Sequence, residues 1–192
     1  MLIGEKLETG PSVEPVLKAA IKTHLRISHS DDDTYIDGLA TAARQRIEDW
    51  TGRALITQTW DLYLDDFPVE RYIRIPRPPL QSVTHLKYYL NEVLTTWDSG
   101  NYIVDIYKLV GRLWLAENVA WPTADDRPNA VEIQYVAGYG DASTDVPNLL
   151  LHAITWFAAH LYENRLPVDM VSLNELPMGL RSIVHQYQVH TV

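Results

Sequence analysis

The sequence predicts an α+β fold, namely a small α-helical bundle with an inserted antiparallel β module and a C-terminal helical arm. Apolar residues recur at helical spacing near both ends of the chain. In the middle they alternate with period two, between separators rich in Gly, Pro, Asn and Asp. We therefore expect a helical bundle domain formed by residues 12–52 and 145–165, a β insertion over 53–144, and a C-terminal docking arm over 166–192.

Two helices are expected before the β insertion. Ser12 is a plausible cap for the first helix, with Pro15 tolerated in its first turn. The second begins at Ser30, where the three aspartates that follow favour the positive end of a helix dipole, and Gly52 is expected to end it. Each helix has one apolar face that needs a partner, so the two are expected to pack together.

The middle of the chain predicts five or six short strands. Ile56, Trp60, Leu62 and Leu64 fall on one face at period two. Such a series of strands, separated by turn residues, favours an antiparallel sheet or a small barrel. The further strand candidates are residues 72–75, 83–90, 102–107, 112–115 and 130–136.

Helical patterns return after the loop "AGYGDAS", in which Gly138 and Gly140 are expected to adopt positive φ angles. The third helix starts near Asp145, with Pro147 just inside its first turn. A short fourth helix is expected from Met178 to about residue 188, after an irregular segment.

Composition excludes several classes of protein. There are no cysteines, so disulfides and Cys-ligated metal sites are absent, and synthesis in a reducing cytosol is compatible. The net charge is −9 and no basic tract occurs, which argues against specific DNA binding. We expect no signal peptide, because the N-terminal stretch "MLIGEKLETG" lacks a basic leader followed by a long apolar run. We expect no membrane partner, because no apolar run approaches the roughly 20 residues of a membrane span.

Two groups of residues could be drawn as metal sites, and neither is expected to be one. His24 and His29 lie near the three aspartates, but those aspartates read as a helix start. His160 and Glu163 are three apart on a helix, yet a di-metal site needs several more inward carboxylates. We therefore predict no catalytic, metal or cofactor residues and no enzyme. A small soluble hydrolase or metal-dependent enzyme stays open as an alternative, because triads are recognised by geometry.

Four ordered segments, "WTGRALITQTW", "IRIPRPPLQSV", "VEIQYVAGYG" and "VPNLLLHAITWFAAHLYENR", resemble the head–tail connector (adaptor) proteins of long-tailed bacteriophages and related prophages. The resemblance covers about residues 17–165. It implies a structural protein of the virion neck, a ring of about a dozen copies below the portal. The ring would receive the next neck or tail protein and let DNA pass. An assembly chaperone absent from the finished particle is a second alternative.

The resemblance suggests a use for the proline-rich segment. Prolines stop strand pairing and stiffen the chain, so the segment could meet a neighbouring subunit or the portal. We therefore expect partner contacts at Arg77, Pro78 and Pro79. The alternative is a rigid crossover between two strands of the same subunit.

The C-terminal arm carries a second expected interface. Its short amphipathic helix could dock into a groove of the portal or of a neighbouring copy. The contact residues would be Leu180, Ile183, Val184 and Tyr187. The alternative is that this helix folds back on its own bundle.

The acidic balance suggests a third feature of a ring. About a dozen copies would sum to roughly −100 charges, a field that repels a passing polyanion. A channel that lets DNA slide should not bind phosphates, so we expect acidic side chains in the lumen. The candidates are Asp31, Asp32, Asp33, Asp65 and Asp66.

Overall fold

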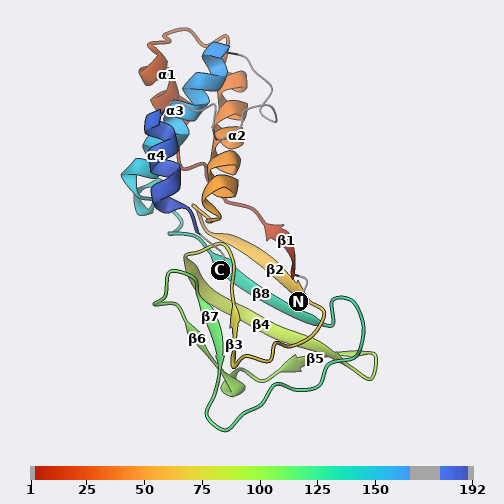
Figure 1. Cartoon of the computed structure of the whole chain (residues 1–192). Coiled ribbons are helices and arrows are strands. Elements are labelled where there is room, and N and C mark those ends of the chain that lie inside the picture. The colour runs from red at the N-terminus through yellow and green to blue at the C-terminus, as the bar shows by residue number, and fades with distance from the viewer. Residues whose placement is uncertain (1–2, 165–177, 190–192) are drawn as a thin grey trace. The chain divides into compact units, whose positions relative to one another are not determined.

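The structure is a computed structural model that describes residues 3–164 and 178–189. The chain divides into two compact units. The β unit comprises Met1–Pro11 and Thr57–Tyr139, and the helical unit comprises Ser12–Ile56 and Gly140–Val192. Helices and antiparallel sheets are both present, which confirms the predicted α+β class. Figure 1 shows the elements of both units.

The β unit contains two antiparallel sheets. The larger has five strands in the order β1-β2-β8-β4-β5, and the smaller has three in the order β3-β7-β6. A 3-10 turn, Ser99–Asn101, leads into β6. The strands are β1 (Ile3–Thr9), β2 (Gln58–Leu64), β3 (Tyr72–Arg74), β4 (Leu80–Leu90), β5 (Val93–Trp97), β6 (Tyr102–Asp105), β7 (Arg112–Leu115) and β8 (Val131–Ala137).

One face of the larger sheet forms the core of the β unit. The alternation in β8 is regular, with every second side chain buried from Val131 to Ala137. This is the pattern of a strand with one face on a core and one in water. The largest fully buried side chains of the unit are Leu62, Leu64, Ile73, Ile75, Leu86 and Tyr135.

The predicted strands are present, and two more were not predicted. β1 pairs antiparallel with β2, with Leu7 opposite Trp60. β5 returns along β4 after a tight turn at Asn91 and Glu92, whose φ angles are 52° and 66°. The sequence predicted one strand over residues 83–90 at this place, without the returning strand. Positive φ at both central residues suits a two-residue hairpin turn, although Asn-Glu is not its usual sequence.

The helical unit packs four helices together (Figure 1). Trp50 of α2 meets Phe157 of α3 at a ring-centroid distance of 5.0 Å. The buried apolar stripes predicted for the second and third helices face each other here, as amphipathic helices require. The helices are α1 (Lys18–Leu25), α2 (Asp33–Thr51), α3 (Asn148–Asn164) and α4 (Met178–Tyr187), with a 3-10 turn at Ser143–Asp145.

The sequence signals located most helix ends well. α2 ends before Gly52, which adopts the left-handed conformation with φ 68°. α3 begins directly after Pro147, and α4 begins at Met178 as predicted. The first helix was predicted wrongly, because α1 begins at Lys18 and not near Ser12. Its N-cap, Leu17, has an extended backbone.

The glycine loop before α3 was predicted half correctly. Gly138 has a φ of 132°, as expected, but Gly140 is not in the positive-φ region. Gly140 is needed for another reason. A Cβ there would lie 2.2 Å from Oδ2 of Asp145, and that oxygen accepts a hydrogen bond from the backbone N–H of Ala142. A close approach, and not backbone strain, therefore selects glycine at this position.

Candidate interaction surfaces

The proline-rich segment connects β3 of the smaller sheet to β4 of the larger one. Arg77 adopts a φ of 54°, and its guanidinium carbon lies 4.0 Å from the ring centroid of Trp60. Its Nε donates to Glu5 Oε2 at 2.7 Å. Pro78 is buried and Pro79 is half-buried. Within the single chain, the segment is therefore a crossover between two strands, and Arg77 makes its contacts inside the same chain. A partner contact at Arg77, Pro78 and Pro79 stays a prediction.

The exposed side of the smaller sheet gathers aromatic and arginine side chains. Tyr72, Trp114 and Ile103 lie opposite one another across its three strands. The rings of Tyr72 and Trp114 stack at 5.3 Å with an interplanar angle of 7°. In the next row lie Arg74, Arg112 and Asp105. We call these six residues the small-sheet face.

Arg112 holds the small-sheet face in shape. Its guanidinium lies over the rings of Trp114 and Tyr72, at 5.0 and 5.5 Å from their centroids. Its Nη2 donates to Asp105 Oδ2 at 2.6 Å, and this hydrogen bond keeps the pKa of Asp105 below its usual value. Ile103 remains 59% exposed. Trp, Tyr and Arg are the residue types that dominate binding hot spots.

Sequence reasoning missed the small-sheet face. Its only signal was the period-two pattern of the strand candidates at 72–75 and 112–115, which places large aromatic residues on the side opposite Ile73 and Leu113. Which side faces the core cannot be read from strands that are apolar on both faces. The loop that follows β6 extends the exposed apolar area. Its exposed apolar side chains are Ile106, Tyr107 and Leu109, and the charged Lys108 is exposed between them.

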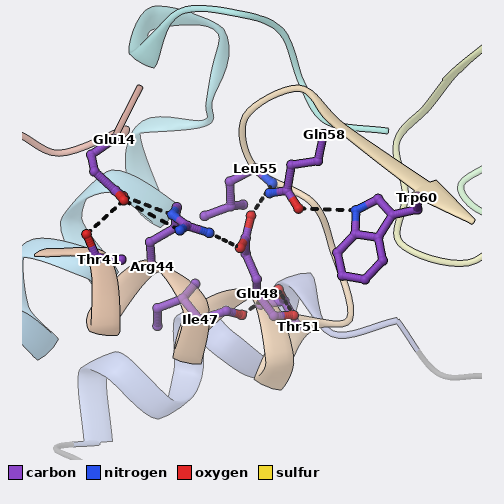
Figure 2. A network of polar contacts seen from close by, with 9 residues as sticks. All are labelled: Glu14, Thr41, Arg44, Ile47, Glu48, Thr51, Leu55, Gln58 and Trp60. Atoms are coloured by element: carbon purple, nitrogen blue, oxygen red, sulfur yellow. Dashed lines mark hydrogen bonds and ion pairs between the residues drawn. The ribbon is translucent and has the colours of Figure 1, made fainter. Parts of the chain in front are cut away.

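A buried polar network organises the helical unit around Arg44 of α2 (Figure 2). Its guanidinium donates to Glu48 at 2.5 Å and to Glu14 at 2.9 Å. Glu48 also accepts from the backbone N–H of Leu55 at 2.9 Å, and Glu14 from the hydroxyl of Thr41. The network therefore ties the segments on either side of the first two helices to α2.

Electrostatics keeps Arg44 charged although it is only 5% exposed. Burial lowers its pKa, but the carboxylates of Glu48 and Glu14 more than offset this effect, so the pKa is raised overall. The same network accounts for the difference between the predicted and the observed start of the first helix. Glu14 contacts Arg44 and Thr41 from a non-helical segment, and only residues from Lys18 onward form α1.

A groove of about 300 Å³ lies on the helical unit. It brings together His24 of α1 with His160 and Glu163 of α3, residues that the sequence had placed in two separate metal candidates. Its other lining residues are Trp156, Ala159 and Leu180. Across residues 3–164 and 178–189, the structure holds no group of three or more His, Cys, Asp or Glu side chains suited to a metal ion.

The predicted docking residues of the arm lie on α4. Leu180 and Val184 are buried in the helical unit, at 1% and 0% exposure, whereas Ile183 and Tyr187 are half-buried. Arg53 donates to the carbonyl of Tyr187 at 2.7 Å and lies over its ring. In the single chain, Leu180 and Val184 therefore pack into the chain's own helical bundle, as the alternative reading expected. Their contact with a partner stays a prediction.

The acidic candidates fall in both units and differ in their contacts. Asp33 pairs with Lys22 at 2.6 Å, which keeps its pKa low, and Asp32 accepts a hydrogen bond from Tyr162. Asp65 accepts from the backbone N–H of Asn129. The exposed residues are Asp31 and Asp66. Within the described part of the chain, no helix combines the length and apolar character of a membrane span.

The comparisons with known proteins agree with the resemblance found in the sequence. Residues 19–99 match the family model described as "Phage gp6-like head-tail connector protein". The matched region runs from α1 to the turn before β6 and includes the first two of the four resembling segments. The match confirms that resemblance over these residues. No curated protein matches the chain.

Solved structures with the same fold come from gene transfer agent (GTA) particles. Chains in the neck of an empty GTA particle computed with C6 symmetry and in the neck of a native GTA particle computed with C12 symmetry both give a TM-score of 0.78. A chain in the virion of a native GTA particle gives 0.79. Each is 22% identical to this chain, and the likeness covers 100% of this chain and 97% of the other.

Proposed function

We propose that this chain is a structural head–tail connector of a tailed phage or a phage-like particle. The match of residues 19–99 to the connector family carries the proposal, and the likeness to GTA neck chains over the whole length supports it. In this role the chain joins the capsid to the tail at the neck of the particle and lets DNA pass. It acts through surfaces and not through a reaction.

We further propose that the working form is a homo-oligomeric ring, with twelve copies as the expected number. The support is that similar chains occur in necks computed with C6 and C12 symmetry. The ring would sit below a portal protein and receive a downstream neck or tail protein. Synthesis takes place in the cytoplasm of the bacterial host, before the chain joins the particle.

The small-sheet face and the proline-rich segment suit a subunit of such a ring. Stacked Tyr72 and Trp114 with Arg112 offer a stiff surface that loses little conformational freedom on binding. Arg77, fixed by Glu5 and Trp60, holds the proline-rich segment in one conformation. Preformed surfaces of this kind suit repeated contacts between copies.

Acidic lining of the lumen is part of the proposal. Asp31 and Asp66 are its strongest candidates, because their side chains are exposed, whereas Asp32, Asp33 and Asp65 are half-buried. Replacing Asp31 and Asp66 with lysine would raise the net charge by four units per copy and should slow DNA ejection from assembled particles. Unchanged ejection kinetics in particles that contain the variant would contradict the acidic lumen.

The proposed docking surface of α4 is smaller than the four residues that the sequence suggested. Because Leu180 and Val184 are buried, the surface offered in the single chain consists of Ile183 and Tyr187, unless α4 leaves the bundle. Ile183→Asp should therefore weaken portal binding while the chain stays folded. Portal binding equal to that of the unmodified chain would remove this role.

The proposed function is tested in cells that produce the particles. Deleting the gene should give DNA-filled heads and free tails that fail to join, and supplying the chain from a plasmid should restore joining. Mass spectrometry of purified particles should detect the chain at ring stoichiometry. A chain required for assembly but absent from finished particles would instead be an assembly chaperone, and normal particles after deletion would overturn both roles.

A further inference from the structure

The two outer strands of the larger sheet differ in how they are protected. β1 carries the charged pair Lys6 and Glu8 on its surface, and a bulge shifts its register between Leu7 and Thr9. Charges and bulges at an edge discourage pairing with other chains. β5, "VLTTW", is a five-residue strand with no charge, no proline and no bulge. The β1 edge therefore has features that discourage pairing with another chain, and the β5 edge lacks them.

The turn before β5 determines which backbone groups are free. In a two-residue hairpin, the residues that flank the turn bond to each other, and the next pair along the strands points its N–H and C=O groups outward. Leu90 and Val93 flank this turn, so Leu94 and Thr96 direct their backbone groups away from β4. Tyr89, opposite Leu94, fits this pattern. Its N–H and C=O bond outside the hairpin, to Ala130 and Asp125.

The edge is preformed and accessible. The carboxylate of Asp125 accepts from the backbone N–H groups of Asn91 and Glu92 and so fixes the turn. Val93 is 63% exposed and Leu94 39%, on opposite faces of the strand. Among the described residues, β5 pairs with β4 alone. An added strand would pair the free backbone groups of this edge and cover the apolar side chains on both of its faces.

We propose that β5 pairs through the backbone groups of Leu94 and Thr96 with a strand of a second copy of this chain. The inference rests on the proposed ring, in which every copy has a neighbour. Charge favours a copy as the partner at this place. Each chain carries −9, so two copies repel, but β5 itself has no charged residue, and two copies can pair there without placing like charges directly opposite each other.

Association in solution provides the first test. Thr96→Pro removes one outward N–H and leaves the β4–β5 hydrogen bonds intact, whereas Thr96→Val keeps that N–H and serves as the matched control. Sedimentation over a range of concentrations should show self-association of the unmodified chain, weakened roughly tenfold or more by Thr96→Pro and little changed by Thr96→Val. Circular dichroism and the melting temperature report whether each monomer stays folded. Equal association of both variants would overturn the proposal.

Crosslinking inside particles provides the second test and covers a variant that fails to fold. A photo-reactive amino acid at Val93 should yield a product with twice the mass of the chain, joined to another copy. A product with a different neck protein, or no product at all, would overturn the pairing between copies. In either case the detection of the chain in the same particles would leave the connector role intact, so the two failures are distinguishable.

Discussion

The guanidinium of Arg77 lies over Trp60, with 4.0 Å between its central carbon and the centroid of the indole ring. The two residues are 17 positions apart, and Glu5, near the N-terminus, completes the contact at 2.7 Å. One side chain thus links β1, β2 and the proline-rich segment. The arrangement gives the first of four predictions.

Arg77→Ala should lower the free energy of unfolding by about 1–2 kcal/mol, because it removes a partly buried cation–π contact and an ion pair. Chemical denaturation measures this value. A double-mutant cycle with Glu5→Ala should give a coupling energy of about 0.5–1 kcal/mol. Strict additivity of the two substitutions would show that the ion pair contributes nothing to stability.

Glu48→Ala should lower the free energy of unfolding by about 3–5 kcal/mol. It leaves the buried charge of Arg44 without its closest partner and the N–H of Leu55 without an acceptor. Asp37→Ala is the matched control, because Asp37 pairs with Lys18 at 2.9 Å on the surface. The control should change stability by less than about 1 kcal/mol. Similar losses for both variants would contradict the structural role of the network.

Gly140→Ala should destabilise the chain by about 1–3 kcal/mol, since its Cβ would displace Asp145 from the turn before α3. Gly38→Ala provides a contrast of opposite sign. Gly38 is exposed within α2 with no atom near its added Cβ, so alanine should stabilise the chain by about 0.5–1 kcal/mol. Thermal unfolding of both variants checks the signs, and a stabilising Gly140→Ala would exclude the close approach to Asp145.

Tyr135→Phe should leave stability near neutral pH unchanged or slightly higher. Tyr135 is fully buried, and its hydroxyl has no hydrogen-bond partner among the described residues. Burial raises the pKa of Tyr135 above its usual value of 10.0. The folded chain therefore keeps this proton at a pH where the unfolded chain releases it.

This difference in proton binding predicts a pH dependence. The contribution of this proton to the free energy of unfolding is fully present below pH 10. It is lost as the pH rises above 10, at about 1.4 kcal/mol per pH unit for one proton. Stability measured between pH 9 and about 11 should fall more steeply for the unmodified chain than for Tyr135→Phe. Parallel curves for the two proteins would show that Tyr135 ionises as readily in the folded state as in the unfolded one.

The elements that the sequence predicted well are those with strong local signals. α2 has regular apolar spacing, acidic residues at its start and Gly52 at its end, and all of these act within the helix itself. β7 was predicted at its observed bounds, because turn residues enclose four residues with regular alternation. Local patterns of this kind need no knowledge of distant neighbours.

β1 and the small-sheet face depended on neighbours that no local pattern reveals. Glu5 lies opposite Leu62, toward the apolar side of the sheet, and forms an ion pair with Arg77, more than 70 positions away. A charged residue at that position argues against a strand until its partner is known. For the same reason, the sequence could not show that His24 and His160 line one groove.

By itself, the sequence determined the fold class, most helix and strand positions, and the resemblance to head–tail connectors, because each rests on residue order along the chain. The tertiary structure alone decided which faces are buried and which are offered to partners. It placed Leu180 and Val184 in the core and left Tyr72 and Trp114 on the surface. Apolar side chains look alike in a sequence, and packing between distant segments selects which of them water still reaches.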